Sequence, residues 1–495
     1  MIWIDSTLLW YASYRVCRNV CGWALYWEKM VLALVFSLAL KSLFLFFLIS
    51  LGIAPTAIIQ IGMSILALFP TLFLRESKEA KIEFEQKKRL NLITFFLIGV
   101  LFSFSMINAW FFPIIESDAV WYHIKSMTFL NEVRFDSDWV VPQLKQYPPF
   151  IPLLFSYLSI FELKFLKIIF PLLYLCLNII FYSRVLTLTK NKKTACLFTM
   201  VLATTPYFWW HGVLPFLDLT AAVFYSTGIF YWYFWIQPKV ENYSFEGNNS
   251  YGLVSGFLLG LSVWTRIEFL LYDLIPIFLT ILIFIRFHGG TENLKSLGLF
   301  FASLLFFPSI WFLNLLTFEM NIWSQIKVLG AICAILWALT IGIAWGKWKT
   351  SEPIFLFIFG VSVLGYFVLL VMAGIGPVST WKKIMISLYR TSTIPIFYLF
   401  TSSLVIFLFF ENLKELSKLK RFLGYFLILF LFVHWGIFAF GNPKWPNLSQ
   451  FFYATFLNPG DSVNLSDTRG MMSFYPVFLF FISSLPFIGE RLIDD

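Results

Sequence analysis

The chain has 495 residues, of which 59% are hydrophobic and only 13% are charged. Soluble domains are nearer half apolar and a quarter charged, so a soluble fold is excluded because it could not cover this much apolar surface. The net charge of +9 does not indicate nucleic-acid binding in such a chain, since basic residues gather in the cytoplasmic loops of membrane proteins.

Apolar runs long enough to cross a bilayer recur along the whole chain. A helix needs about 20 apolar residues for one crossing, and in lipid its backbone groups must be satisfied within the segment. The alternating ten-residue segments of a membrane barrel are absent. We therefore predict an all-α polytopic membrane protein of about 14 transmembrane helices. The candidate spans are 30–52, 54–74, 91–112, 148–161, 164–183, 194–210, 219–236, 252–270, 271–287, 297–315, 324–345, 353–374, 392–410, 422–440 and 472–488.

The first 29 residues mix tryptophan and tyrosine with Arg15, Arg18 and Lys29. This composition is typical of a helix that lies in the membrane interface. A start of translation at Met30 is the alternative. The five cysteines are scattered and indicate neither a zinc site nor a disulfide framework.

Lysine and arginine bias predicts the orientation of the helices. The segments 75–89, 184–193 and 411–421 are basic and are expected in the cytoplasm, which places 113–147 and 441–471 outside. The segments 148–161 and 164–183 lie between an outside loop and an inside loop. Together they must make one crossing, so we expect one of them to be partial and to line a cavity near the outside face.

An acidic pair, Glu116 and Asp118, opens the first outside loop. Two carboxylates beside the bilayer could hold a divalent metal ion such as Mg²⁺ or Mn²⁺, or act as acid and base. The alternative is a pair of ordinary solvated acids, with Asp118 capping a helix that begins at Ala119.

Further charged residues lie at the predicted outside ends of spans. Asp218 precedes an apolar run, as a helix cap or as a group facing a wet cavity. Arg266 and Glu268 end another span and are expected to pair, in a structural or a functional role. The basic residues Lys382, Lys383 and Arg390 are also expected outside, against the charge rule, which indicates an anionic ligand such as a lipid phosphate unless the parity is wrong there. Single histidines, His123 and His211, could act as bases, although interface positions are commoner for such residues.

The order of these motifs resembles a known superfamily. Glu116-Ser117-Asp118 is followed by Tyr122, by Tyr147-Pro148-Pro149, by Asp218, and by a glycine-spaced helix that runs from Gly256 to Thr265-Arg266-Ile267-Glu268. The set resembles the GT-C membrane glycosyltransferases, which include protein O-mannosyltransferases and lipid A aminoarabinose transferases. The resemblance covers roughly 91–290. Phe150 departs from the usual leucine, and two spans precede the family's usual first helix.

The resemblance implies three regions: an N-terminal part, 1–90, with the interfacial helix and two extra spans; a catalytic membrane module, 91–290; and C-terminal helices, 291–495, for acceptor or lipid binding. It implies transfer of a sugar from a polyprenyl-phosphate donor to a hydroxyl of a lipid, glycan or protein acceptor, with inversion. Asp118 would be the base, and Glu116 would orient the acceptor or hold a metal. Asp218 would form the polar floor of the site. Arg390, Arg266 and the two lysines would bind the lipid phosphate, with Tyr122, His123, Tyr147 and Glu268 also lining the substrate site.

Two other readings stay open. A transporter or flippase of lipid-linked sugars would need polar groups at mid-membrane and internal repeats. A glycan polymerase or ligase would use arginines and a histidine in a large outside loop. For all three, a bacterial cytoplasmic membrane is favoured over the endoplasmic reticulum.

Overall fold

A computed structural model describes residues 1–74, 88–135, 147–161, 166–241, 249–286, 291–317 and 472–485, together with parts of 417–431. Within these residues every regular element is helical, as predicted. The helices are α1 (Ile2–Val20), α2 (Tyr26–Ser50), α3 (Ala57–Leu72), α4 (Lys88–Phe111), α5 (Ser117–Asn131), α7 (Phe150–Ile160), the short 3-10 helix η1 (Leu166–Ile168), α8 (Ile169–Thr189), α9 (Lys192–Thr204), α10 (Pro206–His211), α11 (Leu217–Glu241), α12 (Asn249–Thr265), α13 (Phe269–Arg286), α14 (Thr291–Thr317) and α22 (Phe474–Ser483).

Four of these segments are long and apolar enough to cross a membrane: Tyr26–Ser50, Leu92–Phe111, Leu166–Thr189 and Leu294–Asn314. Shorter apolar helices accompany them, among them Ala57–Leu72 and Phe474–Ser483. The protein is therefore a helical membrane protein. The spans predicted at 324–345, 353–374 and 392–410 lie outside the described residues, so the figure of 14 crossings stays a prediction.

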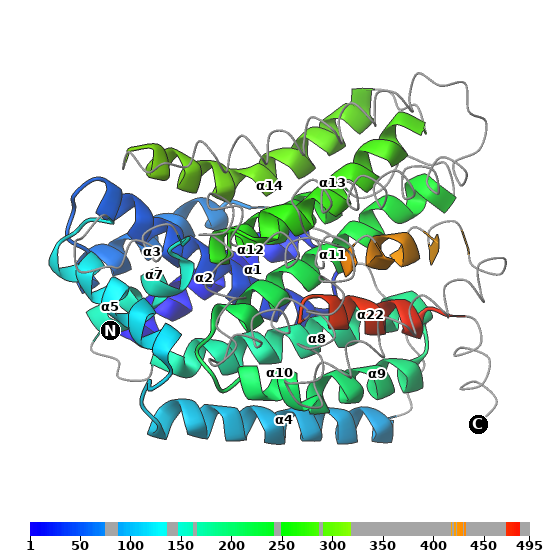
Figure 1. Cartoon of the computed structure of the whole chain (residues 1–495), viewed down its shortest axis with the longest axis horizontal. Coiled ribbons are helices and arrows are strands. Elements are labelled where there is room, and N and C mark those ends of the chain that lie inside the picture. The colour runs from blue at the N-terminus through cyan, green and yellow to red at the C-terminus, as the bar shows by residue number, and fades with distance from the viewer. Residues whose placement is uncertain are drawn as a thin grey trace, which may run out of the picture.

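The helices lie side by side, with α4 along one edge of the bundle and α14 along the opposite edge (Figure 1). Both edge helices expose large apolar side chains, including Phe96 and Phe111 on α4 and Leu294 and Leu313 on α14. In water such faces would be unfavourable, whereas lipid tails solvate them. The outward faces of these helices therefore match a bilayer environment.

Helix α7 has only 11 residues, and every side chain from Phe150 to Leu158 is buried. At 1.5 Å per residue it is about 16 Å long, roughly half the thickness of a bilayer core. The helix is thus too short to cross, as predicted for one of the two segments between 148 and 183.

Glycines on α12 explain the glycine spacing in the sequence. A Cβ atom on Gly256 would lie 2.3 Å from the carbonyl oxygen of Phe300, and one on Gly260 would lie 2.4 Å from that of Leu304. Both carbonyls belong to α14. The small residues therefore let the backbones of α12 and α14 approach closely, which is how membrane helices commonly associate.

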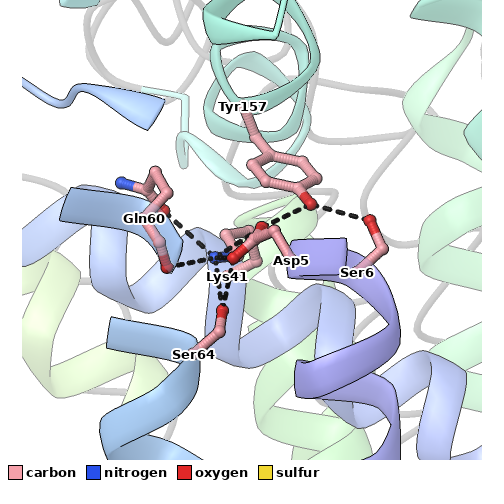
Figure 2. A network of polar contacts seen from close by, with 6 residues as sticks. All are labelled: Asp5, Ser6, Lys41, Gln60, Ser64 and Tyr157. Carbon is pink, nitrogen blue, oxygen red and sulfur yellow. Dashed lines mark hydrogen bonds and ion pairs between the residues drawn. The ribbon is translucent and has the colours of Figure 1, made fainter. Parts of the chain in front are cut away.

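Helix α1 packs along α2 and α3 and carries a buried acid, Asp5. Lys41 on α2 lies 3.0 Å from Asp5 and donates to Gln60 and Ser64 on α3, at 3.2 and 3.1 Å. Tyr157 on α7 donates to the same oxygen of Asp5, Oδ2, at 2.6 Å (Figure 2). We call these five residues, Asp5, Lys41, Gln60, Ser64 and Tyr157, the buried network. It joins four helices. The interfacial orientation of the N-terminal helix stays a prediction.

A second buried ion pair joins α2 to α8. Arg184 donates to Glu28 at 2.5 Å, and both side chains are fully buried. The guanidinium also lies over the rings of Trp23 and Tyr231, at 5.1 and 5.6 Å. We predicted Arg184 in a cytoplasmic loop, which is wrong, because the pair with Glu28 holds it inside α8, which continues to Thr189.

The two buried ion pairs show that residues before Met30 take part in the packing. Asp5 and Glu28 both precede Met30, and each balances a buried cation that comes later in the chain. A chain that began at Met30 would leave Lys41 and Arg184 buried without these acids, at several kcal/mol each. Residues 1–29 are therefore an integral part of the packing.

Candidate functional site

Four separate segments of the chain bring polar side chains to one end of the helix bundle. Asp218 lies in the first turn of α11. Arg266 and Glu268 occupy the short break between α12, which ends at Thr265, and α13, which begins at Phe269. Tyr147 directly precedes the prolines before α7, and Tyr122 lies on α5. We call Asp118, Tyr122, Tyr147, Asp218, Arg266 and Glu268 the end cluster.

Arg266 is the centre of the end cluster. Its guanidinium forms an ion pair with Asp218, 48 residues earlier, and a second one with Glu268 at 3.2 Å. The side chain of Arg266 is 18% exposed and that of Asp218 is 3% exposed, so the pair is nearly buried but not sealed. Arg266 is thus paired, as expected for an arginine at the end of an apolar helix.

Two tyrosines connect the remaining segments. Tyr147 donates to Glu268 at 3.4 Å across 121 residues of sequence. The negative charge of Glu268, together with burial, raises the pKa of Tyr147. Burial and the charge of Asp118 raise the pKa of Tyr122, with smaller effects from Tyr147 and Asp218. Tyr122 therefore lies within electrostatic reach of all the other segments of the end cluster.

The position of Asp118 corrects one prediction. Helix α5 begins at Ser117, with Glu116 as its N-cap residue, so Asp118 lies within the first turn and does not cap the helix. Glu116 makes no cap hydrogen bond through its side chain, and its carboxylate accepts from the backbone N–H of Ile115 at 3.1 Å. The capping alternative for Asp118 is therefore wrong, whereas its role as a base stays a prediction.

Sequence reasoning missed Lys125, one turn beyond Tyr122 on α5. Its ammonium donates to the carbonyl oxygen of Tyr147 at 2.8 Å and lies 5.7 Å from the ring centre of Trp311. Burial lowers the pKa of Lys125 to about 7. The lysine fixes the backbone of the Tyr147 segment against α5. Its burial had no signal in the sequence, since a lysine in a predicted outside loop is ordinarily solvated.

Of the other predicted residues, His123 contacts its own helix, and the basic residues of the C-terminal half fall outside the described residues. His123 is half-buried, and its Nδ1 lies 3.4 Å from the hydroxyl of Ser126 on the next turn. Burial lowers the pKa of His123. Lys382, Lys383 and Arg390 fall outside the described residues, so their convergence on a phosphate stays a prediction.

A metal site at Glu116 and Asp118 also stays a prediction. Among the described residues, no three His, Cys, Asp or Glu side chains are grouped closely enough to hold a metal ion. Further ligands from a substrate or from water would be needed to complete the coordination of Mg²⁺, which keeps several waters in most protein sites.

The end cluster retains unused hydrogen-bonding capacity. In the part of the chain that the structure describes, Arg266 Nε and Glu268 Oε2 are buried and have no hydrogen-bond partner. Buried polar atoms usually find partners, and those left over point to strain or to an absent ligand. The arrangement offers a cation and several carboxylates at the edge of the bundle, a combination suited to a ligand that carries both hydroxyl and phosphate groups.

Asp273 was also overlooked, although it lies within the span predicted at 271–287. The carboxyl is fully buried in α13, and neither oxygen has a hydrogen-bond partner among the described residues. The signal was present in the sequence, because one acid within an apolar span is costly and marks a functional position.

Comparisons with protein-family models, with curated proteins and with solved structures find no match.

Proposed function

We propose that this protein is a membrane glycosyltransferase that moves a sugar from a polyprenyl-phosphate donor to an acceptor hydroxyl at the outside face, with inversion at the anomeric carbon. One observation carries the proposal: the end cluster gathers Asp118, Asp218, Arg266 and their tyrosine partners from four distant segments. These segments are the ones whose order resembles the GT-C glycosyltransferases.

The chemistry of the end cluster fits this reaction. A lipid-linked donor reaches the protein through the membrane, so its phosphate arrives at the end of the bundle. Transfer needs a base to take the proton of the acceptor hydroxyl and positive charge near the leaving phosphate. Asp118 is the proposed base. Arg266 is already paired with Asp218 and Glu268, so it contributes a hydrogen bond from Nε rather than a full free charge.

The test is the substitution Asp118→Asn. The amide cannot accept the proton, and loss of a general base typically slows a reaction by about 10²–10⁴-fold. Since Asp118 does not cap α5, the variant should fold normally. The measurement is transfer of labelled sugar from polyprenyl phosphate in membranes that contain the purified protein.

The matched control is Glu132→Gln, which removes the same charge at the other end of α5, where Glu132 pairs with Arg134. This variant should transfer sugar at a rate close to that of the wild type. Glu116→Gln should have a milder effect than Asp118→Asn, and added Mg²⁺ or Mn²⁺ should partly restore it if Glu116 holds a metal. Near-normal turnover by Asp118→Asn would remove Asp118 as the base.

A transporter of lipid-linked sugars is the second candidate, and one observation favours it. Asp5, Lys41 and Asp273 place ionisable groups inside the bundle, where transporters keep their coupling residues. The same Asp118→Asn variant separates the two functions, because a transporter would still move the lipid-linked sugar across the membrane when no sugar is transferred.

A further inference from the structure

In the part of the chain that the structure describes, three carboxyl groups lie fully buried within the helices: Asp5 on α1, Glu28 on α2 and Asp273 on α13. The first two are compensated. Asp5 lies 3.0 Å from the ammonium of Lys41, and Glu28 accepts from Arg184 at 2.5 Å. Each also accepts from a tyrosine hydroxyl, at 2.6 and 2.7 Å. The fold therefore balances a buried carboxylate with a cation in two separate places.

Asp273 differs from both of these acids. Within the described residues, neither of its oxygens accepts or donates a hydrogen bond, and no charged side chain acts on it electrostatically. It occupies the apolar sequence Phe269–Ile281, five residues after Glu268. At 1.5 Å per residue, it lies about 7 Å deeper along α13 than the end cluster.

Among the described residues, no cation acts on Asp273. On the neighbouring helix α11, Tyr225 is a titratable group close enough to interact with the charge of Asp273. The hydroxyl of Tyr225 donates to the backbone carbonyl of Tyr272 at 3.1 Å, so it is committed elsewhere. The ring of Tyr225 packs against the rings of Phe269 and Phe430, at 5.3 and 5.8 Å. Tyr225 thus brings an aromatic ring, and no charge, to the neighbourhood of the carboxyl.

The energetic difference between the two forms of this carboxyl is large. An ionised carboxylate in such an interior is destabilised far more than a neutral carboxylic acid with unmade hydrogen bonds, because no cation among the described residues offsets its charge. The protonated, neutral form of Asp273 is therefore the more stable of the two. We propose that Asp273 is a proton-binding site within the membrane domain, distinct from the end cluster, and that it reacts with apolar carbodiimides. The proposal does not depend on the proposed glycosyltransferase activity.

The reactivity follows from the proton. A carbodiimide takes the acid proton on one nitrogen, and the carboxylate oxygen then adds to the central carbon to give an O-acylisourea. This adduct rearranges to a stable N-acylurea, with no leaving group and no change of oxidation state. Ionised carboxylates that are paired with Lys41 or Arg184 have no proton to give, so Asp5 and Glu28 serve as controls within the same chain.

The first experiment is infrared spectroscopy of the full-length protein in lipid at neutral pH, as a difference between wild type and Asp273→Asn. Asparagine has the shape and neutrality of the protonated acid, so the variant should fold. We expect the difference to contain the C=O band of a protonated carboxylic acid, shifted in D₂O. Bands of an ionised carboxylate in that difference would overturn the proposal.

The second experiment treats the wild-type protein with dicyclohexylcarbodiimide and locates the adduct by peptide mass spectrometry. We expect the adduct at Asp273, with Asp5 and Glu28 unmodified. A water-soluble carbodiimide should modify Asp273 far less, because the residue lies among apolar side chains. An adduct at Asp5 or Glu28 without one at Asp273 would show that proton occupancy does not follow the pairing described above, and would overturn the proposal. Since this experiment needs no variant, it holds even if Asp273→Asn does not fold.

Discussion

The buried network and the end cluster contain similar types of residue but serve different purposes. In the buried network, Lys41 has its donors directed to Asp5, Gln60 and Ser64, and all three partners are fully buried. In the end cluster, Arg266 is partly exposed and retains an unpartnered Nε beside an unpartnered oxygen of Glu268 among the described residues. The buried network satisfies its cation completely and fixes helices relative to one another, although Gln60 Nε2 is left without a partner. The end cluster combines its spare donor and acceptor with partial exposure at the edge of the bundle, where a ligand can bind.

The largest expected effect comes from breaking the charge balance of the buried network. Lys41→Met leaves Asp5 buried without its cation, which should cost about 3–5 kcal/mol of stability. The double variant Asp5→Leu/Lys41→Met should recover much of this loss, because no uncompensated charge remains. Thermal unfolding in detergent measures both.

The matched variant in the end cluster is Arg266→Met. It should destabilise the protein less than Lys41→Met, since water reaches Arg266, and yet it should abolish sugar transfer. Equal losses of stability for Lys41→Met and Arg266→Met would mean that the two regions do not differ in the way proposed here.

A pair of tyrosines gives a smaller and sharper contrast. Tyr157→Phe removes a 2.6 Å hydrogen bond to Asp5 in the buried network, and hydrogen bonds to charged groups contribute about 1.5–3 kcal/mol. Tyr147→Phe removes a 3.4 Å hydrogen bond to Glu268, which at that length should contribute less than about 1 kcal/mol. Unfolding and transfer assays on both variants should therefore show a stability defect for Tyr157→Phe and mainly an activity defect for Tyr147→Phe. The opposite assignment of the two defects would contradict the comparison.

A further contrast is a dependence of stability on pH through Lys125. Its pKa is about 7 in the folded protein against 10.5 ordinarily, so between these values the unfolded chain binds more protons. Stability should therefore rise as the pH increases from 7 toward 10, and this rise should be absent from Lys125→Met. Melting temperatures at pH 7 and pH 9 for the two proteins test it. A wild-type protein that loses stability over this range, relative to Lys125→Met, would contradict the burial of the lysine.

The sequence was most informative where the signal is local. Hydropathy placed most helices from 30 to 315 within about six residues, because an apolar run of the right length has few alternatives to a helix in lipid. The single span predicted at 194–210 is wrong, because the chain breaks at Thr205 between α9 and α10. Asp218, Arg266 and Glu268 were identified individually because each charged side chain stands beside an apolar run. The start of α5 was misplaced by two residues, which turned Asp118 from a first-turn residue into a supposed cap.

Contacts between distant residues could not be predicted in the same way. Nothing near Lys41 in the sequence indicates that Asp5 balances it, and Glu28 and Arg184 are 156 residues apart. Such pairs are set by which helices become neighbours, and a single sequence holds no direct record of that. Lys125 was overlooked for the same reason, since its burial depends on Trp311 and on the Tyr147 segment.

The long separation of Glu28 and Arg184 also has a consequence for biosynthesis. Chains are made at about 5–20 residues per second, so Glu28 enters the membrane roughly 8–30 seconds before its partner is synthesised. During this interval the acid must rest near water, which its place in the first turn of α2 permits. Helix α2 can therefore insert into the membrane before α8 is made, and Glu28 becomes buried only when α8 packs against α2 and supplies Arg184.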